Sequence, residues 1–374
     1  MLPGIGVFGT GEVAKVFVPL LREKDFSIKA IWGKTISDAE KAAKDLNIPF
    51  FTNKIDDVLL RKDVDLVFII CLPYLHSEIS VKALGIGKHV VCDKPMGICE
   101  SDALKMVRAS QYYPALISLV NHSLRFLPAI THMKRHIADG MIGQIELIDI
   151  RVHIGSLLRS KFDWMCDASM GGGILNLVGS HVIDLVKFLL NGKKATRAHG
   201  LIRTYKISNA NVNGIRQISA PDYCTFQLEV EGNVLVSASL FGNTVASNTF
   251  FQEIMVCGRD GHLVVRGGDL FVMKIKDESL QREEAVYVDV QDLHFSTLDS
   301  TLPKPYIKGL CKMVGALKES FSQNENAWVK EPVQAAANFE DGLYVRSVID
   351  AICKSNECRN WCKVEISPEY TPIS

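Results

Sequence analysis

The sequence lacks several features that would restrict its function at once. Lys+Arg and Asp+Glu number 42 each, so the formal net charge is zero and no overall charge attracts nucleic acid or an anionic membrane. No apolar run approaches the roughly 18 residues that a membrane-spanning helix needs. Internal repeats and low-complexity segments are absent as well. We therefore expect neither a nucleic-acid partner nor a membrane partner.

The ten cysteines include no C-x-x-C pair, so zinc-ribbon and thioredoxin chemistry have no support and we expect no metal site. Cysteines scattered singly are typical of a reducing compartment, which favours a cytoplasmic location. Cys353, Cys358 and Cys362 lie close together near the C-terminus. We interpret them as surface thiols, with cross-linking or metal binding as the alternative.

The apolar N-terminus, MLPGIGVFGTGEVAKVFVPLL, superficially resembles a signal peptide. It has no basic leader, and four glycines together with Glu12 and Lys15 interrupt any apolar core region. A strand, a loop and a helix describe this segment better. Secretion is the alternative to a cytoplasmic location.

Length and patterning favour two domains, and residues 1–122 form the first. Its expected strands are Ile5–Phe8, Ile28–Trp32, Phe50–Phe51, Asp65–Cys71 and His89–Cys92. The expected helices cover Ala39–Leu46, capped by Ser37 with Glu40, then Glu78–Leu84 and Ser101–Ser110. Strands that alternate with helices predict a doubly wound parallel α/β sheet.

A glycine-rich loop follows the first strand and opens the first helix. Gly9, Gly11 and Ala14 match G-x-G-x-x-A in the context that a dinucleotide fingerprint requires. Thr10, Glu12 and Val13 complete the loop and the first helical turn, whose N–H groups would face a pyrophosphate. An ordinary glycine turn is the alternative.

The end of the second strand, Ile31–Thr35, has no acid for the ribose 2′-hydroxyl of NAD. Lys34 and the Thr35 hydroxyl are instead suited to a 2′-phosphate, which mildly favours NADP over NAD. The alternative is an ordinary solvated lysine.

Residues 123–374 are expected to form an α/β substrate and oligomerisation domain, whose late helices could pack back on the first. Strands are expected at Ile145–Ile154, Ala198–Tyr205, Tyr223–Val230, Asn233–Leu240, Phe251–Cys257, Gly261–Arg266 and Leu270–Lys274. Helices are expected at Gly173–Leu190, Pro305–Phe321 and Val333–Ala351. Short strands joined by glycine turns predict a largely antiparallel sheet in an α+β domain. Its open face is a natural surface for a homodimer.

Three segments carry a resemblance to a known family. They are IICLPYLHSEISVKALGIGKHVVCDKPMG, NHSLRFLP and GGGILNLVGSHVIDL. Together with the glycine loop they resemble the glucose–fructose oxidoreductase/inositol dehydrogenase (Gfo/Idh/MocA) family. MLPGxGVFGT, LRFLPA, MGGG and FEDGLY are similar to the animal glucose–fructose oxidoreductase domain-containing group.

The resemblance assigns Asp93, Lys94 and Pro95 to the family's Glu/Asp-Lys-Pro signature beside the nicotinamide. It explains why a lysine follows a buried strand, since parallel sheets bind ligands at the carboxyl ends of their strands. Lys94 would handle the proton of a hydroxyl, with a pKa lowered by desolvation, and Asp93 would orient cofactor or lysine. A lysine that merely reaches solvent is the alternative.

Two more segments gain expected roles from the resemblance. Pro73 and His76 match a Pro-x-x-His turn that would wall the nicotinamide ribose, although His76 could equally be a helix N-terminal residue without a ligand. Asn121 is expected near the cofactor and, with His122, near substrate hydroxyls, while Arg125 could simply pair with an acid.

The family's GGG-x-x-x-Asp-x-x-x-His pattern is incomplete. His181 is present as a catalytic candidate, with a merely structural histidine as the alternative, but Leu177 occupies the aspartate position. In an α-helix, spacing of i and i+4 would place an acid on the same face as His181. Asn176 lies one residue away, about 100° round such a helix.

We thus expect an NAD(P)-dependent oxidoreductase that transfers hydride to or from a sugar, polyol or related cyclic hydroxyl or ketone. The alternative is a dinucleotide-binding sensor or scaffold with little or no turnover, which Leu177 favours. The fold would also permit a redox-assisted glycosidase or lyase, but no motif demands one.

Overall fold

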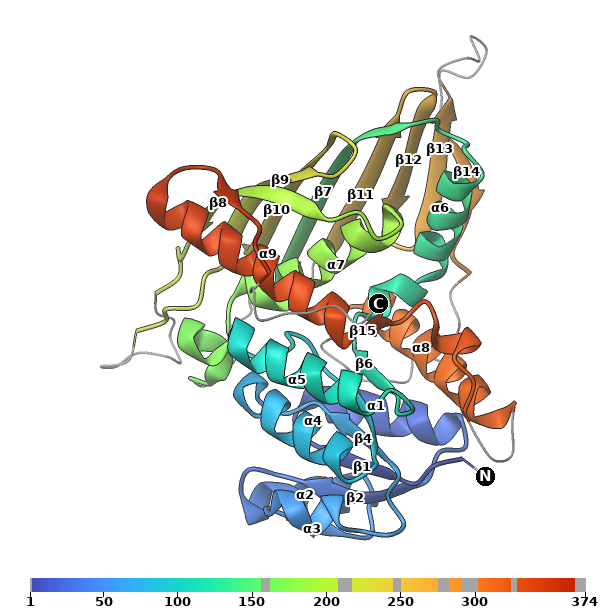
Figure 1. Ribbon diagram of the computed structural model, residues 1–374, viewed down its shortest axis with the longest axis vertical. Helices are drawn as coiled ribbons and strands as arrows, with labels where there is room; N and C mark the ends of the chain where they lie inside the picture. Colours follow the sequence, from blue (N-terminus) through green and yellow to red (C-terminus); the bar gives the residue numbers. More distant parts are fainter. Residues whose placement is uncertain are drawn as a thin grey trace. The chain divides into compact units, whose positions relative to one another are not determined.

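The computed structural model (Figure 1) describes residues 2–155, 162–207, 217–244, 250–274, 283–290, 302–323 and 328–366. The chain divides into two compact units. Unit 1 contains Met1–Phe126 and Asp292–Leu343, and unit 2 contains Leu127–Gln291 and Tyr344–Glu369. The first division falls a few residues beyond the expected boundary at 122. The segment Asp292–Leu343 returns to unit 1 instead of continuing unit 2.

Unit 1 is built on a seven-stranded sheet in the order β15-β6-β5-β4-β1-β2-β3. The strands are β1 (Ile5–Phe8), β2 (Ile28–Trp32), β3 (Phe51–Thr52), β4 (Leu66–Ile69), β5 (His89–Cys92), β6 (Ser118–Val120) and β15 (Ala337–Asn338). The first six are parallel, and β15 pairs antiparallel with β6 at the edge. The doubly wound prediction is confirmed, with the 3-2-1-4-5-6 order of dinucleotide-binding folds.

The helices of unit 1 connect these strands. They are α1 (Glu12–Glu23), α2 (Ile36–Asp45), α3 (Ile55–Leu59), α4 (His76–Gly85), α5 (Glu100–Tyr112) and α8 (Lys304–Ser322), with 3₁₀ turns η1 (Pro73–Leu75), η2 (Ser123–Phe126) and η7 (Glu331–Val333). The predicted cap of α2 by Ser37 was wrong. Thr35 is the N-cap, and its hydroxyl accepts the Asp38 N–H at 3.1 Å.

One hydrophobic core explains why α8 belongs to unit 1. Ile307, Leu310 and Leu317 of α8 are buried together with Val7 of β1 and Phe17 of α1. Strands β1 and β4 are buried along their whole length, as expected of central parallel strands covered on both faces.

Unit 2 is built on a nine-stranded sheet in the order β14-β13-β12-β11-β7-β10-β9-β8-β16. The strands are β7 (Ile145–Gly155), β8 (Ala195–Arg203), β9 (Tyr223–Val230), β10 (Val234–Thr244), β11 (Phe251–Gly258), β12 (Gly261–Arg266), β13 (Asp269–Lys274), β14 (Glu284–Tyr287) and β16 (Cys362–Lys363). Only β7 and β10 pair in parallel among the described pairs. The largely antiparallel sheet is confirmed.

Helices cover one face of this sheet (Figure 1). They are α6 (Pro128–Ala138), α7 (Ser180–Leu189) and the part of α9 (Phe339–Cys358) that follows the division between Leu343 and Tyr344. Residues of all three, including Met133, Ile183 and Val348, are buried in one core with the strands. The helical stretch Ala168–Leu189 has the length and composition of a membrane span, but 72% of its apolar window is buried in the protein. The burial identifies it as a core element.

Two expected helices have different boundaries. Gly173–Leu190 is not one α-helix, because Leu175–Gly179 (η5) forms a π-helical turn in which the Ser180 N–H bonds to the Leu175 carbonyl. The last helix begins at Phe339, not at Val333, because η7 and β15 occupy the intervening residues. Further 3₁₀ turns are η3 (Trp164–Cys166) and η4 (Ala168–Met170).

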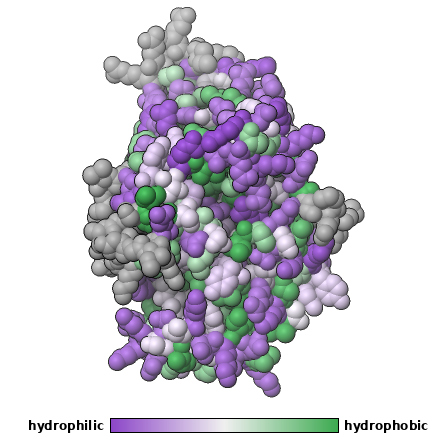
Figure 2. Space-filling model, turned by 90° about the vertical axis from the view of Figure 1, so that its left-hand side faces the viewer, coloured by the Kyte–Doolittle hydropathy of each residue, from purple (hydrophilic) through white to green (hydrophobic). Residues whose placement is uncertain are grey.

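Hydrophilic and hydrophobic residues are intermixed on the surface that Figure 2 presents. Large hydrophobic residues that are strongly exposed, such as Leu60 and Tyr112, come from different elements. Such scattered exposure is ordinary for a folded protein.

Candidate active site

The glycine loop of unit 1 leaves open space in front of α1. Gly9 has φ +135, and a Cβ there would lie 2.7 Å from the Ile70 carbonyl oxygen, so the position requires glycine. Gly11 is the N-cap of α1 at φ −79, and a Cβ there would meet nothing within 4 Å. The protein itself therefore does not explain a glycine at position 11. Close approach of a ligand would.

The first turn of α1 suits a phosphate group. Among the described residues no side chain caps the helix, so its first N–H groups, including those of Glu12 and Val13, are not taken by a capping residue there. The Glu12 carboxylate pairs with Lys15 at 2.8 Å, which offsets its repulsion of an anion. Ala14 is fully buried at the third fingerprint position. The loop and this turn thus fit a dinucleotide pyrophosphate.

The end of β2 is too crowded for an acid at Gly33. A Cβ on that residue would lie 2.8 Å from the Ala39 nitrogen and 2.9 Å from Thr10 Cγ2. Lys34 beside it is exposed. The Thr35 hydroxyl donates to Asp38 Oδ2 at 2.6 Å as part of the α2 cap. Thr35 therefore has a structural role that the sequence argument did not foresee, and Lys34 remains as the cationic group for a 2′-phosphate.

The carboxyl ends of β5 and β6 carry a buried polar network. Asn121 donates its Nδ2 hydrogens to Asp93 Oδ1 at 2.9 Å and to the Tyr306 hydroxyl at 3.0 Å. Asn121 is fully buried, and its Oδ1 has no hydrogen-bond partner among the described residues. A buried acceptor without a partner is costly, so it favours a ligand that supplies a donor. Burial also raises the pKa of Tyr306.

Tyr306 was missed by sequence reasoning. It lies in α8, 185 residues after Asn121, and no motif connects the two positions. The one available signal was the expectation that late helices pack back on the first domain.

Lys94 follows this network directly in the chain. It is half-buried, and the loss of hydration lowers its pKa, an effect that the neighbouring Asp93 carboxylate partly opposes. The expected direction of the pKa shift is confirmed. A lysine with a lowered pKa can exchange a proton near neutral pH more readily than an exposed one.

His76 ties the turn after β4 to the Asp-Lys-Pro segment. It is 1% exposed, and its ring nitrogens face the carbonyl oxygens of Pro95 and Cys71, each at 3.1 Å. Burial lowers the pKa of the imidazole. These contacts support a role for His76 in positioning the Asp-Lys-Pro segment. Pro73 begins η1 and is buried.

The other two candidates after β6, Arg125 and His122, are buried and make contacts within unit 1. Arg125 pairs with Asp341 at 3.2 Å and donates to the Ala335 carbonyl oxygen at 3.2 Å, which confirms the alternative of an acid partner. His122 is 3% exposed, with its N–H bonded to the Val120 carbonyl.

The helical segment of unit 2 that carries Leu177 and the catalytic candidate His181 begins with a π-turn. His181 lies in the first turn of α7 and is 6% exposed. Leu177 is half-buried inside the π-turn. The regular α-helix expected between the two positions is therefore wrong, because a π-turn, which holds more residues per turn, precedes α7. Asn176 lies five residues before His181. Because a π-turn holds more residues per turn, Asn176 and His181 lie closer to the same side of the helix than they would in a regular α-helix.

The Asn176 side chain nevertheless forms structural hydrogen bonds within unit 2. Its Nδ2 donates to the Gly172 carbonyl at 3.2 Å, and its Oδ1 accepts from Arg346 at 3.3 Å. Both amide groups are therefore engaged in holding the triple-glycine segment to α9. π-Turns inside helices are frequent at functional sites, which is consistent with a special role for this segment.

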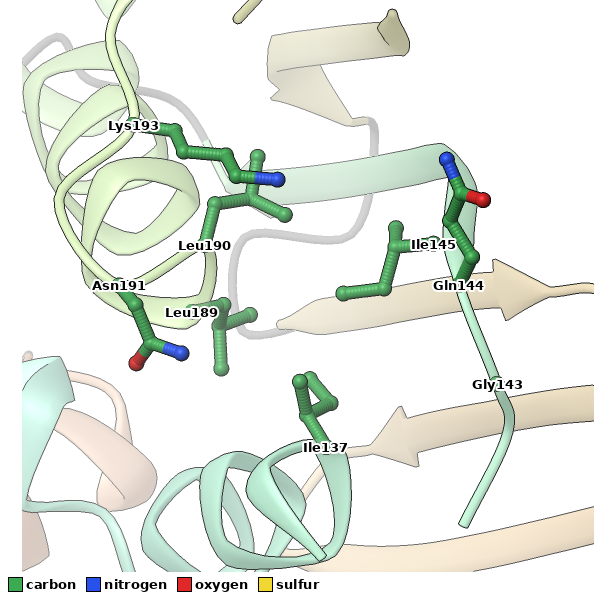
Figure 3. A pocket seen from close by; sticks show the side chains of 8 residues that line it. All are labelled: Ile137, Gly143, Gln144, Ile145, Leu189, Leu190, Asn191 and Lys193. Atoms are coloured by element: carbon green, nitrogen blue, oxygen red, sulfur yellow. The ribbon is translucent and has the colours of Figure 1, made fainter. Parts of the chain in front are cut away.

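Unit 2 also contains a cavity of about 240 Å³ at the end of α7 (Figure 3). Its apolar wall comes from Ile137, Ile145, Leu189 and Leu190. Gln144, Asn191 and Lys193 are polar residues of its lining, and the Lys193 side chain extends toward the apolar wall (Figure 3). It contains none of the predicted site residues, so we do not connect it with the candidate active site.

The parallel sheet and its glycine loop define a dinucleotide-binding protein of the Rossmann class. Comparison with known families agrees: the oxidoreductase family model with an NAD-binding Rossmann fold matches residues 4–119, and the GFO/IDH/MocA C-terminal domain model matches residues 130–264. The chain belongs to the Gfo/Idh/MocA oxidoreductase family.

Similar proteins cover nearly the whole chain. Glucose-fructose oxidoreductase domain-containing protein 2 of Xenopus laevis is 45% identical over 99% of this chain and 96% of that protein. The human protein of the same name is 44% identical over 99% of this chain and 95% of that protein. The resemblance found in the sequence is thereby confirmed.

Solved structures share the fold at lower identity. A levoglucosan dehydrogenase in complex with NADH and levoglucosan has a TM-score of 0.79 and 20% identity, covering 97% of this chain and 99% of that chain. An NAD-binding oxidoreductase from Klebsiella pneumoniae has a TM-score of 0.79 and 20% identity, covering 98% and 100%.

Proposed function

We propose that this protein is an NAD(P)-dependent oxidoreductase that acts on a hydroxyl or ketone of a sugar or cyclic polyol. The observation that carries the proposal is the Asp93–Asn121–Tyr306 network beside Lys94, a lysine of lowered pKa. The polar network would be expensive to bury without a ligand to use it. The levoglucosan dehydrogenase neighbour supports a carbohydrate-like substrate.

Each residue then has a defined task. The nicotinamide cofactor supplies hydride chemistry when it is bound. Lys94 Nζ takes the proton of the reacting hydroxyl in oxidation and returns it in reduction. Asn121 fixes Asp93 and offers Oδ1 to a donor, while His76 holds the peptide carbonyl of Pro95. His181 of unit 2 is proposed as a second proton-handling group.

We propose NADP as the mildly preferred cofactor. Because the Thr35 hydroxyl belongs to the α2 cap, this preference rests on Lys34 alone. Lys34→Asp should weaken NADPH binding about tenfold and change NADH binding little, because a like charge would face the 2′-phosphate. Isothermal titration with both dinucleotides measures the two affinities. Lys41→Asp on the exposed side of α2 is the matched control. Equal losses for NADPH and NADH would refute the assignment of Lys34.

The oligomer is a further part of the proposal. We propose a homodimer through the face of the nine-stranded sheet opposite its helices. Leu235 and Phe251 belong to this sheet and are 41% and 44% exposed. Leu235→Arg should shift the protein to a monomer in sedimentation velocity. An unchanged dimer would place the interface elsewhere, and a wild-type monomer would remove the proposal.

The main test begins with small molecules released from purified native protein and identified by mass spectrometry. Retained NAD(H) or NADP(H) is expected. Sugars and polyols are then screened by nicotinamide absorbance. Turnover of the cofactor supports the oxidoreductase. Retained cofactor that no candidate oxidises or reduces would instead support the sensor or scaffold that Leu177 suggested. That alternative is not favoured by the intact network at Lys94.

A further inference from the structure

A pair of thiols lies at the end of unit 2, outside the proposed active site. Cys358 is the last residue of α9, and Cys362 is the first residue of β16. Their Sγ atoms are 3.5 Å apart. Cys358 is exposed, whereas Cys362 is 8% exposed. A disulfide bond has an S–S distance of roughly 2.05 Å, so the two sulfurs would have to approach each other by about 1.5 Å more.

The turn between the two cysteines is fixed by its backbone. Arg359 adopts φ +57, and its N–H bonds to the Ser355 carbonyl at 2.9 Å. The Ser355 hydroxyl donates to the Asn360 carbonyl at 2.6 Å, and the same oxygen lies 3.8 Å from both sulfurs. Strand β16 is held by its pairing with β8. The close approach of the thiols is therefore built into a hydrogen-bonded turn.

The two thiols are not equivalent. Burial raises the pKa of Cys362, and the adjacent Cys358 raises it further, whereas Lys354 acts in the opposite direction. A buried thiol of raised pKa is a poor first nucleophile, because the thiolate is the reactive form. The exposed Cys358 is the group that an external reagent reaches first.

We propose that Cys358 and Cys362 form a thiol–disulfide exchange site for low-molecular-weight disulfides. The Cys358 thiolate attacks one sulfur of such a disulfide, breaking its S–S bond and releasing one thiol. Cys362 loses its proton and attacks Cys358 Sγ, releasing the second thiol. The two protein thiols are oxidised by two electrons to one disulfide, and the reagent is reduced to two thiols.

Oxidation would link the end of α9 to the edge of the nine-stranded sheet. Strand β16 is the edge strand beside β8, and it pairs only through Cys362 and Lys363. A bond from Cys362 to α9 would hold this short strand in place. The site thus couples the redox state to the order of one sheet edge.

The probe is glutathione disulfide, added to the full-length reduced protein at increasing ratios to reduced glutathione. After rapid alkylation, peptide mass spectrometry locates the modified cysteines. Wild type should form the Cys358–Cys362 disulfide with little lasting glutathione adduct at Cys358. Cys362→Ser should instead accumulate the mixed disulfide at Cys358, because the resolving thiol is gone. Cys358→Ser should leave Cys362 reduced.

Cys99→Ser removes another exposed thiol and serves as the control, so it should form the Cys358–Cys362 disulfide as wild type does. Circular dichroism verifies that each variant is folded. A stable glutathione adduct at Cys358 of the wild type would overturn the proposal, as would equal adduct levels in wild type and Cys362→Ser. Absence of any reaction at Cys358 would overturn it as well.

Discussion

Unit 1 and unit 2 retain different amounts of the machinery that the family resemblance implies. In unit 1 the glycine loop, Lys94 and the hydrogen-bonded pair of Asp93 and Asn121 all lie at the carboxyl ends of parallel strands. In unit 2 the triple glycine and His181 are present, and by the family resemblance Leu177 would occupy the position of an acid. The π-turn Leu175–Gly179 also interrupts the regular α-helix before His181.

This difference between the units separates what dinucleotide binding requires from what proton transfer requires. Dinucleotide binding depends mainly on backbone geometry, which glycine positions and a helix N-terminus provide. Proton transfer depends on side chains whose pKa values are adjusted by their surroundings. We therefore expect cofactor binding to be robust in this protein and turnover to be sensitive to a few side chains.

The largest effect on cofactor binding should come from Gly11→Val. A side chain there would occupy the space where the pyrophosphate approaches and would disrupt charge-assisted hydrogen bonds worth roughly 3 kcal/mol, or about a hundredfold in affinity. The fold should survive, because a Cβ at Gly11 meets nothing within 4 Å. Fluorescence titration with NADH measures the loss.

Gly85→Val is the matched control, since its Cβ also points into open space. Both variants should melt close to wild type. Tight NADH binding by a folded Gly11→Val protein would remove the argument that this loop holds a dinucleotide.

The largest effect on turnover should come from Lys94→Met, which keeps the apolar stem and removes the ammonium. Turnover should fall roughly 10²–10⁴-fold while dinucleotide affinity changes little. The wild-type oxidation rate should rise with pH through the lowered pKa of Lys94, because the neutral amine is the base, and the variant should lose this rise. Steady-state kinetics across pH test both points.

Lys82→Met, on the exposed face of α4, is the control for loss of a lysine. His181→Ala belongs to the same series. If both residues serve one step, the double variant should fall well short of the product of the single losses. Wild-type turnover by Lys94→Met would make Lys94 structural.

The comparison between the units can be sharpened by placing an acid at position 177, where the family resemblance expects one. Leu177→Asp should raise turnover roughly tenfold, because a carboxylate near His181 would orient the imidazole and favour its protonated form. Some stability should be lost with the half-buried leucine, about 1–2 kcal/mol.

Leu177→Asn is the control, since it has a similar shape and no charge. Turnover should not rise in that variant. An equal increase in both variants would mean that polarity, and not the acid, was limiting. No change in either would leave Leu177 without a catalytic consequence.

A smaller effect concerns acid stability and should be confined to unit 1. His89 Nδ1 accepts the Ile117 N–H at 3.0 Å, and burial lowers the pKa of His89 to about 4 from 6.5. The unfolded chain therefore binds the proton more readily between these values. The stability contribution is complete above about pH 6.5 and is lost as the pH falls toward 4, roughly 2 kcal/mol after allowance for partial exposure.

Hydrogen exchange at pH 4.5 and 7, normalised for intrinsic rates, should show strands β4 and β5 losing protection at the lower pH. His89→Asn keeps an acceptor without a titrating ring and should reduce this difference. Equal acid sensitivity in wild type and His89→Asn would contradict the assignment.

Much of the fold followed from local patterns in the sequence. β5, β9 and β12 have the expected boundaries, because alternating or continuous apolar runs end at clear turns. The short strands β6 and β16 were not foreseen, since three and two residues give no period. The π-turn was also not foreseen, because its residues share the apolar pattern of an α-helix.

Site residues that belong to one short sequence motif could be predicted. Site residues that are brought together only by tertiary packing could not. Gly9, Gly11, Asp93 and Lys94 sit in short signatures, whereas Tyr306 reaches Asn121 only through the packing of α8. Thr35 was assigned to a ligand because a hydroxyl at a loop suits a phosphate. The same hydroxyl also suits a helix cap, and that local bond is the one formed.

The return of α8 to unit 1 has a consequence for how the chain is made. The core of unit 1 needs Ile307, Leu310 and Leu317, which are synthesised only after almost all of unit 2. Contacts so distant in sequence form slowly, because a long loop must close first. A nascent chain that ends before α8 would expose the apolar face of α1 and its neighbouring strands. The parallel sheet would then depend on the later helix, or on a chaperone, to cover that face during synthesis.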